Sequence, residues 1–136
     1  MTEADKKKAL NLVKIFWLIT EDKYDKLRTL EGCEKLYDLK ATVTDGKQIQ
    51  AIADGIGVKP EHKFINISPE LKELKKTYLS ILKLTKELTV AGKRHIIFVY
   101  VGGHGATLDE KQIYLLNDND AKNAQFHIEF KLRYLA

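Results

Sequence analysis

Residues 96–105 of this 136-residue chain read Ile-Ile-Phe-Val-Tyr-Val-Gly-Gly-His-Gly, and this stretch decides the fold. The first six residues are apolar or aromatic, are rich in β-branched side chains, and are followed by glycine. Such a run is typical of a strand that is buried on both faces of a parallel sheet. The glycines permit a sharp turn that presents His104 at the carboxyl end of the strand, where the functional groups of open α/β sheets gather.

A histidine in this position suits proton transfer, because the unperturbed pKa of the imidazole lies near neutrality. The alternative is that His104 is an ordinary loop residue beside a glycine turn. Other glycine-rich motifs fit less well. No lysine–serine pair follows, as a phosphate-binding loop requires, and a dinucleotide fingerprint would need its third glycine at Leu108 and a helix afterwards.

The composition indicates one globular domain. Hydrophobic residues make up 44% of the sequence and charged residues 31%, which is typical of a globular protein and not of a disordered or membrane chain. No run approaches the roughly 18 apolar residues of a membrane span, and the charged start has no signal-peptidase site, so we expect a cytoplasmic or nuclear protein. Cys33 is the single cysteine, which excludes an internal disulfide framework.

The formal charge is +4, and much of the excess falls between Lys59 and Arg94. Most of these cations lie on one expected helix, and a solvated helix face accounts for them. No interleaved aromatic platform and no known nucleic-acid module accompanies them, so we predict neither a nucleic-acid nor a membrane partner. The helix lysines are Lys72, Lys75, Lys76, Lys83 and Lys86.

Apolar runs alternate with amphipathic stretches along the chain. The runs predict strands at 12–19, 63–67 and 95–101, with Trp17 and Phe98 in the core. Helices between successive strands imply βαβ units, a parallel sheet and right-handed crossovers.

The two expected helices have recognisable ends. Asp45 is a suitable N-cap for the first helix and Gly57 a natural stop, with Ile49, Ile52, Ala53 and Ile56 on the face toward the sheet. For the second helix, Ser68 is the expected cap, Pro69 the first helical residue and Gly92 the stop. Its apolar stripe consists of Leu71, Leu74, Tyr78, Ile81, Leu82 and Leu88.

Two segments resemble the caspase-like cysteine peptidases, which comprise caspases, metacaspases and paracaspases. Tyr100–Gly105, followed by Ile113–Leu116, is similar to their strand, Ser-Gly-His-Gly turn and returning strand, with Gly102 in place of the common serine. Residues 45–58 are similar to the segment before their second strand, with Gly46 in place of the usual alanine. Both segments occur in the βαβαβ order that the family has.

The resemblance implies a three-layer α/β sandwich with a mainly parallel sheet, the caspase-like fold, incomplete in this sequence. It divides the chain into a charged N-terminal arm, residues 1–11, and a caspase-like domain, residues 12–136. It implies that His104 is the general base and acid and that the amide of Gly105 contributes to the oxyanion hole. It implies no cofactor and no metal.

Caspase-like catalysis also needs a cysteine nucleophile, which in caspases lies about 50 residues after the histidine. No cysteine follows His104 here, so we expect a domain that descends from cysteine endopeptidases but is non-catalytic as this chain. The alternative is a scaffold subunit that uses the fold for protein–protein interaction. Cys33 follows the first strand and is either a small buried hydrophobe or a substitute nucleophile. Arg28 lies in the same connection, but its neighbours do not match the family's substrate-reading motif, so it receives no role.

The sequence ends before the strand that would carry the nucleophile, which would leave an apolar sheet edge exposed. We therefore expect a protein partner, or the rest of a longer domain, to cover this edge. A peptide substrate is expected only if a nucleophile is supplied. The tail gives a conflict, because 126–134 alternates like a strand whereas the family has a helix there, and we follow the family.

Overall fold

The structure is a computed structural model that describes residues 2–5, 12–29, 32–108, 110–117 and 125–126. Its central sheet contains β1 (Val13–Thr20), β2 (Lys63–Ile67) and β3 (His95–Gly102). The strand order is β2-β1-β3, and both pairings are parallel. The predicted parallel α/β sheet and its three strands are therefore confirmed. The predicted arm at 1–11 lies mostly outside the described residues.

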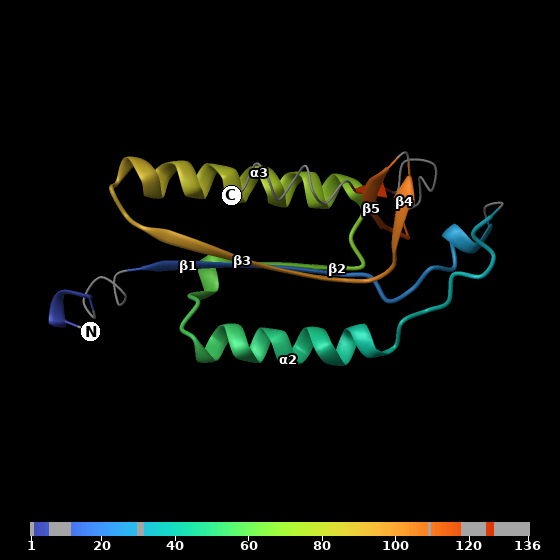
Figure 1. Ribbon diagram of the computed structural model, residues 1–136, viewed down its shortest axis with the longest axis horizontal. Helices are drawn as coiled ribbons and strands as arrows, with labels where there is room; N and C mark the ends of the chain where they lie inside the picture. Colours follow the sequence, from blue (N-terminus) through green and yellow to red (C-terminus); the bar gives the residue numbers. More distant parts are fainter. Residues whose placement is uncertain (1, 6–11, 30–31, 109, 118–124, 127–136) are drawn as a thin grey trace.

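Strand β1 occupies the centre because it is the most continuously apolar segment, and Ile15–Ile19 is entirely buried. Successive side chains of a strand point to opposite faces, so the two faces contribute to separate cores. Ile15, Trp17 and Ile19 pack with helix α3 (Leu71–Val90), whereas Phe16 and Leu18 pack with helix α2 (Ala41–Gly55). Figure 1 shows the two helices on opposite sides of the sheet, which gives a three-layer sandwich.

Helix α3 follows the sequence expectation along its length but not at its start. Leu74, Tyr78, Ile81 and Leu88 are buried, and the backbone of Gly92 adopts φ = 68° after the last turn. The prediction that Ser68 caps α3 was wrong. Glu70 is the N-cap residue, while the Ser68 hydroxyl donates a 2.9 Å hydrogen bond to Asp22 Oδ1 and so joins the end of β2 to the end of β1.

Helix α2 begins five residues earlier than predicted, with Lys40 as its N-cap, so Asp45 lies inside the helix. Its sheet-facing side is lined by small residues. Thr42, Gly46 and Ala53 are buried, and a Cβ at Gly46 would stand 3.5 Å from Thr20 Cγ2. Ile52 and Ile56, predicted to face the sheet, are 59% and 38% exposed, because the close approach at the small residues turns them outward.

The end of α2 was predicted correctly. Gly57 has φ = 86°, a conformation that glycine adopts without the steric penalty of a Cβ. Its N–H donates to the Asp54 carbonyl, and the N–H of Val58 donates to the Ala53 carbonyl, so the last carbonyl groups of the helix are satisfied.

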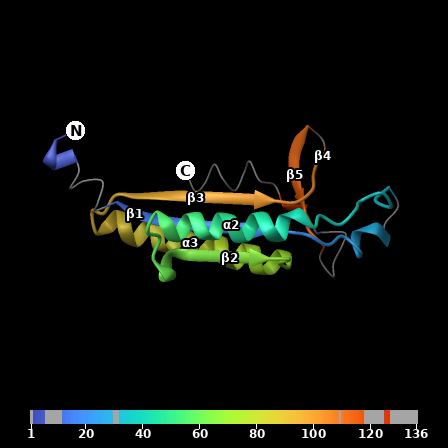
Figure 2. The same cartoon turned by 90° about the horizontal axis from the view of Figure 1, so that it is seen from below.

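Strand β3 is not buried on both faces, which corrects the first expectation drawn from its sequence. Ile97, Val99 and Val101 pack against the core under α3, and Tyr100 packs against the core under α2. Ile96 and Phe98 point to the α2 side and are 38% and 37% exposed, so Phe98 is not a core residue. Figure 2 shows the reason, since α2 runs over β1 and leaves β3 on its flank.

After β3 the chain forms a small antiparallel sheet of β4 (Gly105–Leu108), β5 (Lys111–Leu115) and β6 (Gln125–Phe126). The returning strand expected at 113–116 corresponds to β5. The helix predicted for the tail, 126–135, starts at a residue that is in β6, and its remaining residues lie outside the described part of the chain. In the described residues, no helix is both long enough and apolar enough to cross a membrane.

Candidate active site

The backbone of the turn that carries His104 is fixed from both sides. The His104 N–H donates a 2.8 Å hydrogen bond to the Tyr24 hydroxyl, and the His104 carbonyl accepts a 3.0 Å bond from the Leu115 N–H. The Tyr114 hydroxyl donates to the Gly102 carbonyl at 2.6 Å. Gly103 passes between these groups, and its lack of a side chain allows both tyrosine hydroxyls to approach the turn. The turn therefore presents His104 in one orientation at the carboxyl edge of the sheet.

The imidazole ring of His104 is held by the segment that follows β1. Its Nε2 lies 2.8 Å from the backbone carbonyl of Tyr37. Since a carbonyl only accepts hydrogen bonds, Nε2 carries the proton and Nδ1 of the neutral ring keeps its lone pair. The ring also meets the rings of Tyr24 and Tyr37 edge to face, with centroids 4.7 Å and 4.9 Å apart. His104 is half-buried, so the predicted base is accessible and also oriented.

Two buried tyrosines support this arrangement as neutral hydrogen-bonding groups. Burial raises the pKa of Tyr24 to about 12 and raises the pKa of Tyr114 further above its usual range. Both phenols therefore stay protonated at neutral pH. Their role in the site is to hold the Gly102–His104 backbone, and neither is suited to act as a base.

A buried acid that was not predicted from the sequence, Glu21, follows β1 next to this turn. The residue is 1% exposed, and its carboxylate oxygens accept long hydrogen bonds from the amides of Lys23 (3.4 Å) and Asn117 (3.3 Å). Burial raises the pKa of Glu21, although these bonds act in the opposite direction. Its position directly after a buried parallel strand could have indicated a site residue, because the carboxyl ends of parallel strands lie at one edge of the sheet.

Asn117 links the end of β5 to the loop after β1. Its Oδ1 accepts hydrogen bonds from the N–H groups of Lys26 (2.7 Å) and Leu27 (3.1 Å), and its Nδ2 donates to Asp25 at 2.6 Å. The antiparallel hairpin is thus attached to the connection that also supplies Tyr24 and Tyr37. The loop after β1 and the hairpin of β4 and β5 therefore together position His104.

The other residues singled out from the sequence have different surroundings. Arg28 forms an ion pair with Asp38 at 2.7 Å and donates to the Leu36 carbonyl at 2.9 Å, so it braces the loop after β1. Cys33 is half-buried in the same loop, and its carbonyl accepts the Leu36 N–H. Its thiol makes no hydrogen bond with His104 in the described structure. Gly105 begins β4 and pairs with Tyr114 in the ladder.

The described residues contain no group of three or more histidine, cysteine, aspartate or glutamate side chains arranged to hold a metal ion. The chemistry that this arrangement can perform is proton transfer at His104 Nδ1. Comparisons with protein-family models, with curated proteins and with solved structures find no match to this chain. The caspase-like identity therefore stays a prediction.

Proposed function

We propose that this chain is a caspase-like domain that descends from cysteine endopeptidases, retains the histidine base and is not catalytic alone. The observation that carries the proposal is the orientation of His104. Its Nε2 is engaged by the Tyr37 carbonyl, which leaves Nδ1 as the proton acceptor at the carboxyl edge of a parallel sheet. The strand, glycine turn and returning strand around it support the resemblance on which the family assignment rests.

In a complete site of this kind, His104 would take the proton of a thiol and later give it to the leaving amine, while the Gly105 amide would stabilise the oxyanion. The sequence contains no cysteine after His104 to supply that thiol. The base contributes only about 10²–10⁴-fold and one oxyanion donor about 10²–10³-fold. Together they do not hydrolyse peptides at a useful rate, so a peptide becomes a substrate only when a nucleophile is supplied.

Fluorogenic peptides directed at arginine, lysine and aspartate, assayed with and without calcium, test this proposal. We expect no turnover above that of a matched His104→Ala variant. Turnover that disappears in both Cys33→Ala and His104→Ala would contradict the claim of inactivity and identify Cys33 as the nucleophile. Turnover that persists in both variants would come from a contaminating peptidase.

A second candidate function, a scaffold or assembly subunit, is favoured by the open side of β3. In the described chain β3 pairs with β1 alone, and Ile96 and Phe98 are partly exposed beside that edge. An unpaired edge next to apolar side chains is a template for an added strand. We propose that a protein partner, or further sequence of the same domain, covers it, and that the chain acts in the cytoplasm or nucleus. Size-exclusion chromatography of wild type and Phe98→Asp tests self-association through this surface.

A further inference from the structure

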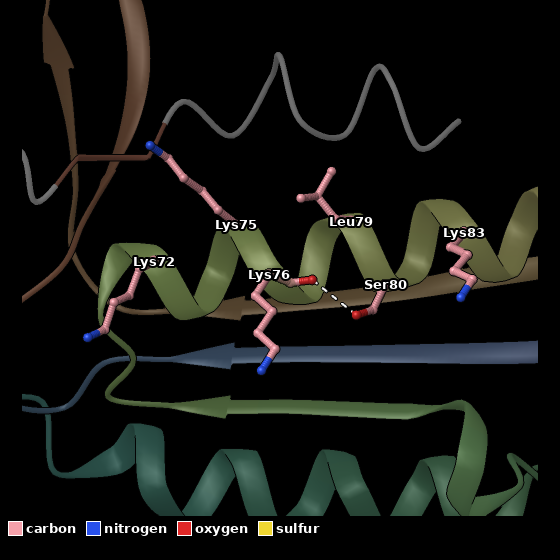
Figure 3. A pocket seen from close by; sticks show the side chains of 6 residues that line it. All are labelled: Lys72, Lys75, Lys76, Leu79, Ser80 and Lys83. Atoms are coloured by element: carbon pink, nitrogen blue, oxygen red, sulfur yellow. Dashed lines mark hydrogen bonds between the residues drawn. The ribbon is translucent and has the colours of Figure 1, made fainter.

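The outer face of α3 carries a groove of about 470 Å³ that lies on the side of the helix away from the core. Figure 3 shows its lining side chains, which all come from the first two-thirds of the helix. They are Lys72, Lys75, Lys76, Leu79, Ser80 and Lys83. Leu74, Tyr78 and Ile81 of the same turns are buried against the sheet, so the groove is separate from the packed face.

The groove lies between two ridges of the helix surface. Residues 72, 76 and 80 form one row at four-residue spacing, and residues 75, 79 and 83 form the next. A groove between such rows is where the side-chain ridge of another helix packs. From Lys72 to Lys83 the rows extend about 16 Å at 1.5 Å per residue, or three turns of a partner helix. The shape therefore fits a helical segment.

Most of the charge of the groove is uncompensated within the described structure. Among the described residues, its lining contains four lysines and no acid. Lys72 pairs with Glu70 at 3.1 Å, whereas Lys75, Lys76 and Lys83 form no ion pair with any residue that the structure describes. Lysines three and four positions apart on one helix face repel each other and disfavour the helix. An anionic partner would remove this repulsion.

The apolar centre of the groove indicates which class of anion the groove fits. Leu79 is 63% exposed among the lysines, and Ser80 donates its hydroxyl to the Lys76 carbonyl at 3.1 Å, so it is not free to bind a phosphate with that proton. Among the residues that the structure describes, no arginine or aromatic side chain lines the groove, although arginine binds phosphates through two parallel hydrogen bonds and aromatic rings stack on bases. A peptide offers both carboxylates for the lysines and an apolar side chain for Leu79.

We propose that this groove binds an acidic amphipathic helix whose glutamate or aspartate side chains flank a large apolar residue. The apolar residue packs on Leu79, and the carboxylates face Lys75, Lys76 and Lys83. This partner site is independent of the proposed histidine chemistry, because α3 presents it on the surface opposite the sheet. Binding weakens with added salt, since the ion pairs are exposed to solvent.

The test uses fluorescence anisotropy of the full chain with a labelled amphipathic peptide that has glutamates and a leucine along one face. We expect the charge-reversed variant Lys75→Glu/Lys76→Glu/Lys83→Glu to bind roughly tenfold more weakly or worse, about the effect of losing several surface ion pairs. The matched control Lys23→Glu/Lys35→Glu/Lys47→Glu has the same net charge, places its changes at exposed positions elsewhere, and should bind much more tightly than the groove variant. Circular dichroism verifies that each variant is folded, and Lys→Gln at the three groove positions provides a milder second variant.

Leu79→Ala separates this proposal from simple attraction of any polyanion. We expect it to weaken peptide binding several-fold and to leave the binding of a single-stranded oligonucleotide of equal charge unchanged. Equal weakening of peptide binding by the groove and control variants would overturn the proposal. Peptide binding that is unchanged in Leu79→Ala would also overturn it. Tighter binding of the oligonucleotide than of the peptide would assign the groove to nucleic acid instead.

Discussion

The Tyr24 hydroxyl accepts a hydrogen bond from the His104 N–H at 2.8 Å across 80 residues of sequence. The same hydroxyl lies 3.3 Å from the Leu115 carbonyl and donates to it. One phenol thus connects the loop after β1, the turn after β3 and the end of β5. The position of the candidate base depends on this contact as much as on the strand that leads to it.

Tyr24→Phe should destabilise the fold by about 1–3 kcal/mol, because it leaves the His104 N–H and the Leu115 carbonyl without their partner in a part-buried place. Urea unfolding at constant m-value measures this change. Tyr37→Phe is the control. The Tyr37 contacts with His104 use its backbone carbonyl and its ring, both of which the variant retains, so its unfolding midpoint should match wild type. Equal midpoints for wild type and Tyr24→Phe would show that the hydrogen bonds do not hold the turn.

Gly103→Ala tests the close packing of the turn. Gly103 has φ = 152°, and an added Cβ would stand 2.8 Å from Tyr114 Cε2 and from the hydroxyls of Tyr114 and Tyr24. Because these tyrosines are buried and hydrogen-bonded, they cannot move aside freely, and we expect a loss of at least about 1–3 kcal/mol.

Gly55→Ala is the matched control for that substitution. Gly55 lies in the last turn of α2 with open space around it, so an alanine there should stabilise the protein by up to about 1 kcal/mol. Thermal unfolding should therefore move in opposite directions for the two Gly→Ala variants. A neutral Gly103→Ala would mean that the tyrosine hydroxyls do not pack on the turn as described.

The strands of the central sheet could be predicted from the sequence because each is a short apolar run with a clear stop. Trp17 was assigned to the core correctly for this reason, and its indole N–H also finds a buried partner, Asn66 Oδ1, at 2.7 Å. Phe98 was assigned wrongly, because a run that is apolar on both faces does not reveal how far a covering helix extends sideways. The start of α2 was missed because Lys40 caps it without a side-chain hydrogen bond, whereas Asp45 looked like a better cap.

The candidate site could be predicted only in part. His104 stands out locally, since glycines surround it at the end of a strand. The partners of His104 cannot be recognised in the sequence, because the Tyr37 carbonyl and the Tyr24 hydroxyl lie 67 and 80 residues away. A backbone acceptor also has no signature in a sequence. Glu21 was missed although it directly follows β1, since an acid after a strand is common in ordinary loops as well.

Glu21→Gln should flatten the pH dependence of stability. Burial raises the pKa of Glu21 in the folded state above its ordinary value of 4.5, so the folded protein holds this proton more tightly than the unfolded chain does. Its contribution to stability is complete below the unfolded pKa and is lost as the pH rises through the folded pKa. Glutamine does not ionise, so the variant should avoid this loss.

Urea unfolding of wild type, Glu21→Gln and the exposed control Glu61→Gln at a series of pH values above 4.5 measures this difference. The wild-type and Glu61→Gln curves should fall in parallel, and the Glu21→Gln curve should fall less. The absolute stability of Glu21→Gln is not the readout, because the amide also changes the hydrogen bonds from Lys23 and Asn117. Parallel curves for all three proteins would contradict an ionisable buried Glu21.

Hydrogen exchange along β3 should alternate with residue number. The ladder with β1 begins with the Val13 N–H donating to the Arg94 carbonyl and ends with the Glu21 N–H donating to the Gly102 carbonyl. Since alternate residues of a parallel strand bond to the same neighbour, the even-numbered residues of β3 direct their N–H groups to β1. The odd-numbered residues Ile97, Val99 and Val101 direct theirs to the open edge.

We therefore expect the amides of Ile96, Phe98 and Tyr100 to be protected in the isolated chain and those of Ile97, Val99 and Val101 to exchange much faster. A partner that adds a strand to this edge should slow the odd-numbered amides selectively, because only they gain new acceptors. Two-dimensional NMR after transfer to deuterated buffer resolves the individual amides. Uniform protection of both sets in a monomer would show that the edge is already paired, and the proposed partner would then have no strand to join.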